Sequence, residues 1–345
     1  TNKLLLGGRV REQGRGIKHN KIKVKSIGEL SEVDISNFIS TDGVESSRLL
    51  KCSRCITLTS KCEECKKEHK PVPKEQAEWT EAVKENLIYN EEEKRYTAQY
   101  VYNKNLENLP SNKEAALRIS KAFEKKMEAN GLIDKLNESY GKFRKSVIFL
   151  DTEEPLDSNL QESFITLTYA LANSDHKNTK FRLCTNSSLK TSENNPSLNE
   201  SMIDGPQYLN PVHKVLTCWR CYKHVAYSDI SSAYHQIKSS DKDKALRKIW
   251  VKPNKFGKEA DEPWVVAHCS VCQFGDKLAG SFCTAAILDA AERWMDHKNA
   301  TLLKNNIIMD DILLGGESLE ELKASEEDVN RGLNNASLKV KEWIF

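Results

Sequence analysis

The stretch NNIIMDDILLGG, residues 305–316, places two adjacent carboxylates, Asp310 and Asp311, inside a run of large apolar residues. Apolar residues alternate on both sides of the pair, which predicts two short strands with buried faces. Two like charges in that setting repel each other and lose hydration, so they need a compensating partner. A polar hairpin turn would hydrate them, but hairpin turns favour Asn-Gly or Asp-Gly, and here glycine follows only at Gly315. The stretch alone leaves two interpretations open, a tight turn and a metal site.

The length of the chain allows two or three domains, because it has 345 residues. No run of eighteen apolar residues is present, so we expect no membrane span, and no secretory signal precedes the globular part. The sequence begins at Thr1 rather than Met and stops at Phe345 within an apolar stretch. We therefore expect a fragment of a longer polypeptide.

Residues 1–78 differ in composition from the rest of the chain. They contain a single aromatic residue, Phe38, and begin with a basic segment, residues 1–25, that either meets nucleic acid or stays solvated. Such a segment buries too little apolar surface to offset its chain entropy. We predict a mostly irregular linker here.

The ten cysteines occur mostly in Cys-x-x-Cys pairs, which favours bound metal or free thiols in a reducing compartment. Two pairs in the linker have the spacing of a tetrahedral zinc site: Cys52, Cys55, Cys62 and Cys65. The alternative is a disordered, redox-labile cluster. Two later pairs lie in a predicted helix and a predicted strand, so we expect them to pack in the core: Cys218 with Cys221, and Cys269 with Cys272.

From Trp79 onward the composition is that of a globular protein. Ser111 and Glu114 form a capping box for a helix that ends at Asn130-Gly131, and a second helix follows over about 132–143. Apolar periodicity predicts further helices at 209–221, at 279–297 and after Ser318. Alternating apolar residues predict strands at 97–102, 147–150, 164–171, 180–185, 224–229 and 264–271. This order predicts an α+β fold in which helices back an antiparallel sheet.

Asp229, at the end of the predicted strand 224–229, is the best candidate for a third acidic ligand beside Asp310 and Asp311. Mg²⁺ prefers octahedral oxygen ligands and usually takes one or two carboxylates plus substrate phosphates. Two such ions can activate an attacking oxygen and stabilise a leaving one in phosphoryl transfer. Taken alone, Asp229 is better explained as a strand-end or helix-cap residue, because spacing does not show that it lies near the pair.

Three segments resemble the catalytic motifs of reverse transcriptases, in the order of that family. The segment SDISSAYHQI resembles motif A, which implies Asp229 as a metal ligand and Tyr234 as the steric gate against a ribose 2′-hydroxyl. The segment QFGDKLAGS at 273–281 resembles motif B, which implies that Phe274 and Gly275 contact the incoming nucleotide. The segment IMDD at 308–311 resembles motif C, the catalytic hairpin with its two metal-binding aspartates.

The same resemblance implies roles for two further sets of basic residues. KFRLCTNSS at 180–188 resembles the finger strand that meets the nucleotide triphosphate, which implies contacts from Arg182 and Lys180. After motif C, family members use a lysine as general acid toward pyrophosphate, and Lys339 and Lys341 are both candidates. Motif C departs from the family at Ile308, where an aromatic residue is usual.

The flanking segments resemble the BEL/Pao class of LTR retrotransposons. The counterparts are the cysteine-rich patch, ENLIYNEEEKRYTAQYVY, LPSNKEAALRISKAFEKKMEANGLI and SLNESMIDGP. The resemblance runs from about residue 45 to the end of the chain. It implies a linker with the four-cysteine cluster at 1–78, a helical lead-in to the fingers at 79–150 and polymerase fingers and palm at 151–345, with the thumb and RNase H regions absent.

The resemblance implies an RNA-directed DNA polymerase from a retrotransposon polyprotein. Its cofactors would be two Mg²⁺ ions and a structural Zn²⁺, and its partners an RNA or DNA template–primer and dNTP, without a membrane. Protease, RNase H and integrase regions would lie outside this chain, and the location would be cytoplasmic, in a virus-like particle. Without a thumb we expect weak or no activity from the isolated fragment. The alternative is a decayed or domesticated fragment that binds nucleic acid through a zinc module and does not catalyse.

Overall fold

The structure, a computed structural model, describes residues 73–146, 148–150, 161–172, 180–206 and 208–345. The chain divides into two compact units, Thr1–Val72 and Pro73–Phe345, and every described residue belongs to the second. The four-cysteine cluster of the predicted linker lies outside the described residues. Within them helices alternate with three small sheets, which is the mixed α+β architecture that the sequence predicts.

The second unit begins with helix α3 (Pro73–Glu85) and a hairpin of strands β1 (Leu87–Asn90) and β2 (Arg95–Ala98). Strand β2 also pairs in parallel with the short strand β7 (Lys238–Ser239). The predicted strand 97–102 was right only at its start. The chain leaves the sheet because the backbone N–H of Tyr100 donates to the carboxylate of Asp243 at 3.0 Å instead of to a strand partner.

Two helices, α4 (Lys113–Ala129) and α5 (Ile133–Ser146), form the predicted helical hairpin, and Gly131 adopts φ +63° at the turn between them. The predicted capping box was wrong, because Asn112 is the N-cap residue and no side chain caps the helix. The buried Asn112 amide instead donates to the backbone oxygen of Phe164 and accepts from its backbone N–H, both at 2.7 Å. A contact to a distant strand thus replaces the local one.

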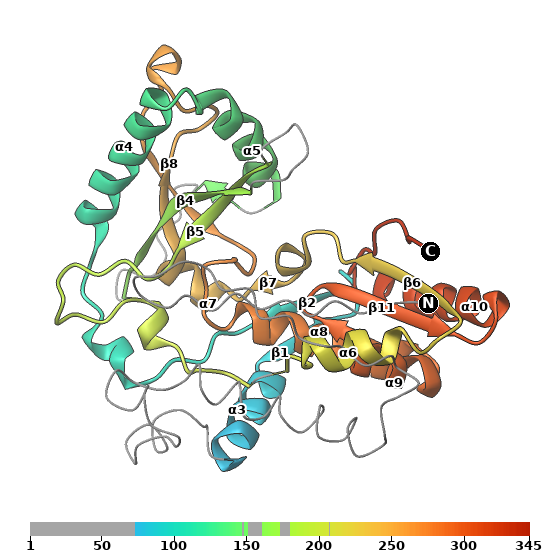
Figure 1. The fold of residues 1–345 in the computed structure, drawn as a ribbon. Helices are drawn as coiled ribbons and strands as arrows, with labels where there is room; N and C mark the ends of the chain where they lie inside the picture. The colour runs from blue at the N-terminus through green and yellow to red at the C-terminus, as the bar shows by residue number, and fades with distance from the viewer. Residues whose placement is uncertain (1–72, 147, 151–160, 173–179, 207) are drawn as a thin grey trace, which may run out of the picture. The chain divides into compact units, whose positions relative to one another are not determined.

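The five-stranded sheet has the order β3-β9-β8-β4-β5. Its strands are β3 (Ile148–Leu150), β4 (Phe164–Ala172), β5 (Lys180–Asn186), β8 (Lys248–Val251) and β9 (Val265–Cys269). All neighbours run antiparallel except β4 and β8, which pair in parallel. Helix α4 contacts β4 and β8, and α5 contacts β5 and β3, so the helical hairpin packs against this sheet (Figure 1).

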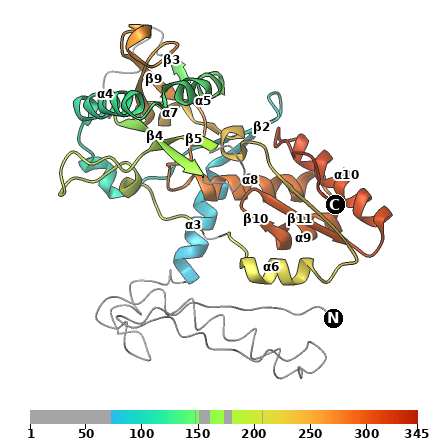
Figure 2. The ribbon, with the colours of Figure 1, turned by 45° about the horizontal axis from the view of Figure 1, so that its top comes forward.

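The three-stranded antiparallel sheet has the order β10-β11-β6, with β6 (His224–Asp229), β10 (Ile307–Ile308) and β11 (Asp311–Gly316). Strand β11 is buried from Ile312 to Gly316, which explains its continuous apolar sequence. Around this sheet lie α6 (Val212–Trp219), α8 (Ala279–Trp294), α9 (His297–Asn306) and α10 (Leu319–Asn334) (Figure 2). Shorter elements are α7 (Asp241–Lys244) and the 3-10 helices η2 (Lys104–Asn108), η3 (Asn199–Ser201), η4 (Ala233–Gln236), η5 (Ala245–Arg247) and η6 (Lys258–Ala260).

The predicted helix over 279–297 is confirmed as α8, which ends at Trp294, and a break at Met295 and Asp296 separates it from the next helix, α9. The break is held by the carboxylate of Asp328 on α10, which accepts from the backbone N–H of Asp296 at 2.9 Å and from the amide of Asn299 at 2.8 Å. Helix α10 itself begins as predicted, because the Ser318 hydroxyl accepts from the backbone N–H of Glu321 at 3.1 Å.

The cysteine prediction was half right. Cys269 and Cys272 are buried in the core, whereas Cys218 and Cys221 are exposed. Helix α6 faces the β6–β11 sheet with buried Val215 and with Trp219, whose indole N–H donates to the backbone oxygen of Leu314 at 2.7 Å. The two thiols project on the solvent side of that contact.

Candidate active site

The sheet β10-β11-β6 brings the three predicted carboxylates together at one end of its strands. Asp229, the last residue of β6, pairs in register with Asp311, the first residue of β11. Ile308 also pairs with Asp311, so Met309 and Asp310 form the two-residue turn between β10 and β11. Met309 adopts the left-handed backbone, with φ +59°, in place of the glycine that such turns favour. Of the two interpretations left open by the sequence, the tight turn is confirmed, and the metal site stays a prediction.

Asp310 is held at the tip of the turn by its backbone, since its oxygen accepts from the N–H of Ile230 at 2.9 Å. The pKa of the Asp310 carboxyl is raised above its ordinary value, chiefly because burial penalises its charged form. The neighbouring charges of Asp311 and Asp229 raise it further, and the ammonium of Lys341 acts in the opposite direction. The site therefore carries excess negative charge.

Asp229 and Asp311 are each held by a neighbouring side chain. The Nζ of Lys341 lies 2.6 Å from Oδ2 of Asp229, and the hydroxyl of Tyr227 donates to Oδ1 of Asp311 at 2.8 Å. That hydrogen bond to Asp311 is the largest cause that raises the pKa of Tyr227 to about 12. Oδ1 of Asp229 is buried and, among the described residues, has no hydrogen-bond partner.

The donor set suits a hard divalent cation, because it consists of carboxylate oxygens and includes the unpartnered Oδ1 of Asp229. As the side chains lie, the described residues contain no group of three or more His, Cys, Asp or Glu side chains that could hold a metal ion. Two of the three carboxylates instead accept a hydrogen bond from a protein side chain, Asp229 from Lys341 and Asp311 from Tyr227.

Tyr234 lies beside Asp310, and Phe274 packs against Tyr234. The ring centroids of Tyr234 and Phe274 are 4.6 Å apart, and Tyr234 is buried while Phe274 is 55% exposed. Tyr234 lines a pocket together with Met309, Asp310 and Gly280. Burial, and to a smaller extent the charge of Asp310, raises the pKa of the Tyr234 hydroxyl to about 12, so the hydroxyl is neutral at physiological pH.

The remaining predicted residues are distributed more widely. Gly275 approaches strand β5 so closely that an added Cβ would lie 2.2 Å from the backbone oxygen of Thr185. Arg182 is exposed on β5, in the five-stranded sheet rather than beside the aspartates, and Lys180 is described only as a backbone position of that strand. The side chain of Lys339 is exposed, and its backbone oxygen accepts from the N–H of Ser231 at 2.8 Å.

The sequence interpretation missed Tyr227 and did not distinguish Lys341 from Lys339. Tyr227 was detectable, because a residue two positions before Asp229 on a strand faces the same side of the sheet. Lys341 was not, because its position depends on how residues 340–344 return along β6, through bridges from Ile230 to Val340 and from Tyr227 to Ile344.

These carboxylates, the paired strands and the neighbouring tyrosine lie in a segment with a known family. Residues 175–342, a little under half of the chain, match the model of the family described as reverse transcriptase (RNA-dependent DNA polymerase). This segment is a reverse transcriptase domain. Its enzyme class is RNA-directed DNA polymerase, a nucleotidyltransferase that uses a nucleic-acid template–primer and dNTP, generally with divalent metal ions such as Mg²⁺.

The reverse transcriptase domain contains all three aspartates and both candidate lysines, since the match extends from residue 175 to residue 342. The palm and fingers fold of polymerases agrees with the mixed helices and sheets of the second unit. A comparison with curated proteins gives no match. In the described part of the chain, no helix is both long enough and apolar enough to cross a membrane.

Proposed function

We propose that the reverse transcriptase domain extends a primer by two-metal nucleotidyl transfer, with Asp229, Asp310 and Asp311 as the ligands of two Mg²⁺ ions. The observation that supports this most directly is the register of β6 against β11, which sets Asp229 opposite Asp311 beside the turn that carries Asp310. The raised pKa of Asp310 adds to it, because a bound cation would offset its causes, chiefly the burial of the charged form and then the repulsion by Asp311 and Asp229. When bound, the ions supply the charge that activates the primer 3′-oxygen and stabilises the leaving oxygen.

In this proposal the protein contributes positioning. The hydrogen bond from Ile230 to the backbone of Asp310 holds the turn, and Tyr227 orients the carboxylate of Asp311. Tyr234 and Phe274 form the surface for the sugar and base of the dNTP, with Gly275 letting the loop lie close to strand β5. Arg182 and Lys180, on the strand of the proposed fingers, meet the triphosphate. Catalysis of this kind consists mainly of orientation and charge neutralisation.

Lys341 is the proposed proton donor to pyrophosphate. Its Nζ reaches Asp229, whereas the side chain of Lys339 makes no hydrogen bond or ion pair with another described residue. A lysine beside the carboxylates is placed to donate a proton to the leaving group of the reaction.

The wider context of the domain is also a proposal. Following the BEL/Pao resemblance, the chain is part of a retrotransposon polyprotein that acts in a cytoplasmic virus-like particle, with fingers and palm in 151–345 behind a helical lead-in over 79–150. The linker 1–78 carries a structural Zn²⁺ on Cys52, Cys55, Cys62 and Cys65. Metal analysis of the purified chain tests the zinc: about one equivalent supports it, and a metal content well below one equivalent contradicts it.

Primer extension on a homopolymer RNA template with Mg²⁺, by the polypeptide extended to include a thumb region, tests the catalytic proposal. Asp310→Asn removes a metal-binding charge and keeps the shape, so incorporation falls by about 10³-fold or more while template–primer binding stays unchanged. Asp134→Asn, at an exposed position in the first turn of helix α5, is the matched control and keeps full activity. Equal activity of the two variants would contradict the assignment.

A binding measurement complements turnover. Titration of the chain with Mn²⁺, followed by electron paramagnetic resonance, reports ion binding directly. Asp310→Asn should weaken that binding, whereas its free energy of unfolding without metal should rise, because the variant removes a half-buried charge whose pKa is raised. Unchanged Mn²⁺ affinity would reject Asp310 as a ligand.

A further inference from the structure

Beneath the loop that carries Phe274, a fully buried ion pair joins two segments distant in sequence. The Nε of Arg247, in η5, lies 2.9 Å from Oδ2 of Asp276, and neither side chain is exposed to solvent. Asp276 stands between Phe274 and the start of helix α8, and its backbone oxygen accepts from the N–H of Ala279 at 3.2 Å. The ion pair therefore lies at the base of the loop formed by residues 273–278.

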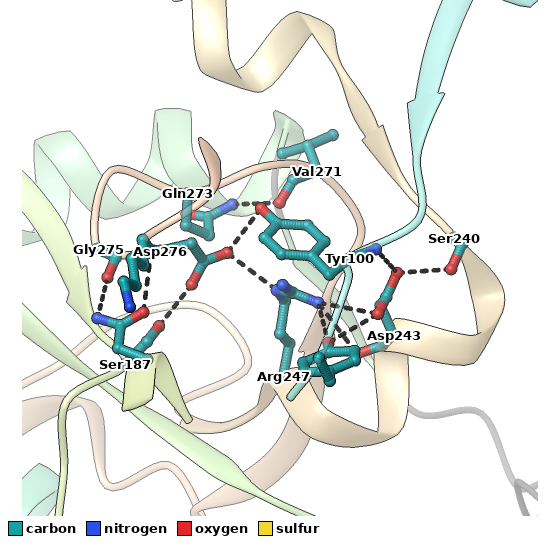
Figure 3. Close-up of polar contacts among 12 residues, drawn as sticks. Tyr100, Ser187, Ser240, Asp243, Arg247, Val271, Gln273, Gly275 and Asp276 are labelled. Carbon is teal, nitrogen blue, oxygen red and sulfur yellow. Dashed lines mark hydrogen bonds and ion pairs between the residues drawn. The ribbon is translucent and has the colours of Figure 1, made fainter. Parts of the chain in front are cut away.

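The Asp276 carboxylate accepts from three separate parts of the chain (Figure 3). Besides Arg247, the hydroxyl of Tyr100 donates to Oδ2 at 2.9 Å and the hydroxyl of Ser187 donates to Oδ1 at 2.5 Å. Ser187 follows strand β5, and Tyr100 follows strand β2. One carboxylate thus connects the loop to the five-stranded sheet and to the sheet β1-β2-β7.

Arg247 is itself held on several sides. Its guanidinium carbon lies 3.4 Å from the centre of the Tyr100 ring, and its Nη1 lies 3.7 Å from Oδ1 of Asp243. The Asp243 carboxylate also accepts from the hydroxyls of Ser240 at 2.6 Å and Tyr102 at 2.7 Å. A planar guanidinium fixed by stacking and by two carboxylates has little rotational freedom. It is a rigid support for Asp276.

On its other side, the loop is held by Asn199. The Asn199 amide donates to the backbone oxygen of Gly275 at 2.8 Å, and its Oδ1 accepts from the backbone N–H of Lys277 at 2.9 Å. Between these supports, Phe274 projects with its ring against Tyr234, at 4.6 Å between centroids, and against His235, at 5.7 Å. The backbone that follows Phe274 is therefore held by contacts in addition to those of the ring itself.

We propose that Arg247 and Asp276 are positioning residues for polymerisation: their ion pair holds residues 273–278 so that Phe274 lies against Tyr234 and completes the nucleotide-binding surface. This inference rests on the proposed function for the contact between Phe274, Tyr234 and dNTP. It assigns a role to Arg247, which lies outside the motifs found in the sequence. The specific alternative is that the pair contributes to global stability alone.

Amide hydrogen exchange of the full chain separates local positioning from global stability. Arg247→Met leaves Asp276 with its Tyr100 and Ser187 donors, and we expect exchange in residues 273–278 to accelerate at least about 10-fold while β6 and β11 keep their protection. Arg247→Lys, which keeps the charge without the planar fork, should restore part of the protection. Asp328→Asn is the matched control, because that buried carboxylate holds the α8–α9 break, and only residues near 295–299 should exchange faster.

If Arg247→Met does not fold, Tyr100→Phe and Ser187→Ala each remove one hydrogen bond to Asp276 and should give a smaller increase at the same residues. Uniform acceleration across the unit would show a purely structural role and overturn the proposal. Unchanged exchange in 273–278, in a folded variant, would overturn it as well.

Steady-state extension adds the functional half of the test. Arg247→Met should raise the KM for dNTP about 10-fold or more with a smaller change in kcat, because the surface for the substrate is displaced. In combination with Phe274→Ala, the two effects on KM should be non-additive if Arg247 acts through Phe274. Faster exchange in the loop with an unchanged KM would keep the positioning role and reject the nucleotide contact of Phe274 instead.

Discussion

Lys341 Nζ lies 2.6 Å from Oδ2 of Asp229, and the backbone N–H of Lys341 donates to the backbone oxygen of the same aspartate at 2.9 Å. The second contact places the lysine by main-chain pairing, so its position beside the carboxylates does not depend on the side chain alone. The ion pair is partly exposed, with 54% of the lysine side chain accessible, and contributes little to stability. The ion pair therefore bears on the proposed function of Lys341 rather than on stability.

Replacing Lys341 with Ala is expected to lower nucleotide incorporation by about 10²-fold, because a proton donor to the leaving group is lost. Thermal unfolding should change by less than about 1 kcal/mol, since the main-chain pairing remains. The control is Lys339→Ala, two residues away and exposed, which should stay within about 2-fold of wild type. Equal losses in both variants would argue against a specific role of Lys341.

Tyr234→Ala is expected to raise the incorporation of ribonucleotides relative to deoxyribonucleotides, by roughly 10- to 100-fold in the ratio of kcat/KM values. The physical reason is that the buried ring, packed on Phe274 in the pocket beside Asp310, excludes the space that a 2′-hydroxyl would need. The ratio is independent of the active fraction, so lost stability does not affect it. Tyr234→Phe keeps the ring and should keep the discrimination; a gain of ribonucleotide use in that variant would reject the steric explanation.

Gly275→Ala is expected to destabilise the protein by about 1–3 kcal/mol, measured by chemical denaturation. Its added Cβ would lie 2.2 Å from the backbone oxygen of Thr185, and a backbone atom does not move away as a flexible side chain would. Gly280→Ala is the comparison, because its Cβ would lie 3.6 Å from the Tyr234 hydroxyl and a helical Ala is favoured over Gly by up to about 1 kcal/mol. A Gly275→Ala variant that is at least as stable as Gly280→Ala would show that the loop can shift, and would contradict the prediction.

His235 is expected to make the free energy of unfolding depend on pH below neutrality. Burial lowers its pKa from 6.5 to about 4 in the folded protein. Between these values the unfolded chain binds a proton that the folded one does not, so the free energy of unfolding falls as pH decreases, by roughly 2–4 kcal/mol in total.

Chemical denaturation at pH 7 and at pH 4 measures this contribution as the difference between wild type and His235→Phe. The substitution suits a site where the ring contacts Phe143 and Phe274 and where Nε2 is buried without a partner among the described residues. The cavity beside His235 is lined by charges of both signs, which include Arg95, Lys145, Glu93 and Asp241, so burial is the cause of the lowered pKa. Parallel pH profiles for the two proteins would disprove the assignment.

The helices and strands with strong local signals were predictable from the sequence. The hydroxyl of Ser318 caps α10, alternating residues form β6, and the apolar arms around Asp310 pair as a hairpin, each for reasons that lie within a few residues. The capping box predicted at Ser111 was wrong, because Asn112 is the N-cap residue and its side chain hydrogen-bonds to the backbone of Phe164, 52 residues away in sequence. Local propensity gave way where a buried amide could satisfy two hydrogen bonds at once.

The candidate site was likewise only partly predictable from the sequence. The residue types and the order of Asp229, Tyr234 and the Asp310–Asp311 pair were readable in the sequence, because their segments resemble the motifs of reverse transcriptases. Only the tertiary structure decided that Lys341 rather than Lys339 reaches Asp229, and that Arg247 supports the loop of Phe274. Both depend on strand register and on the burial of charges from distant segments, and neither quantity has a periodic signal along the chain.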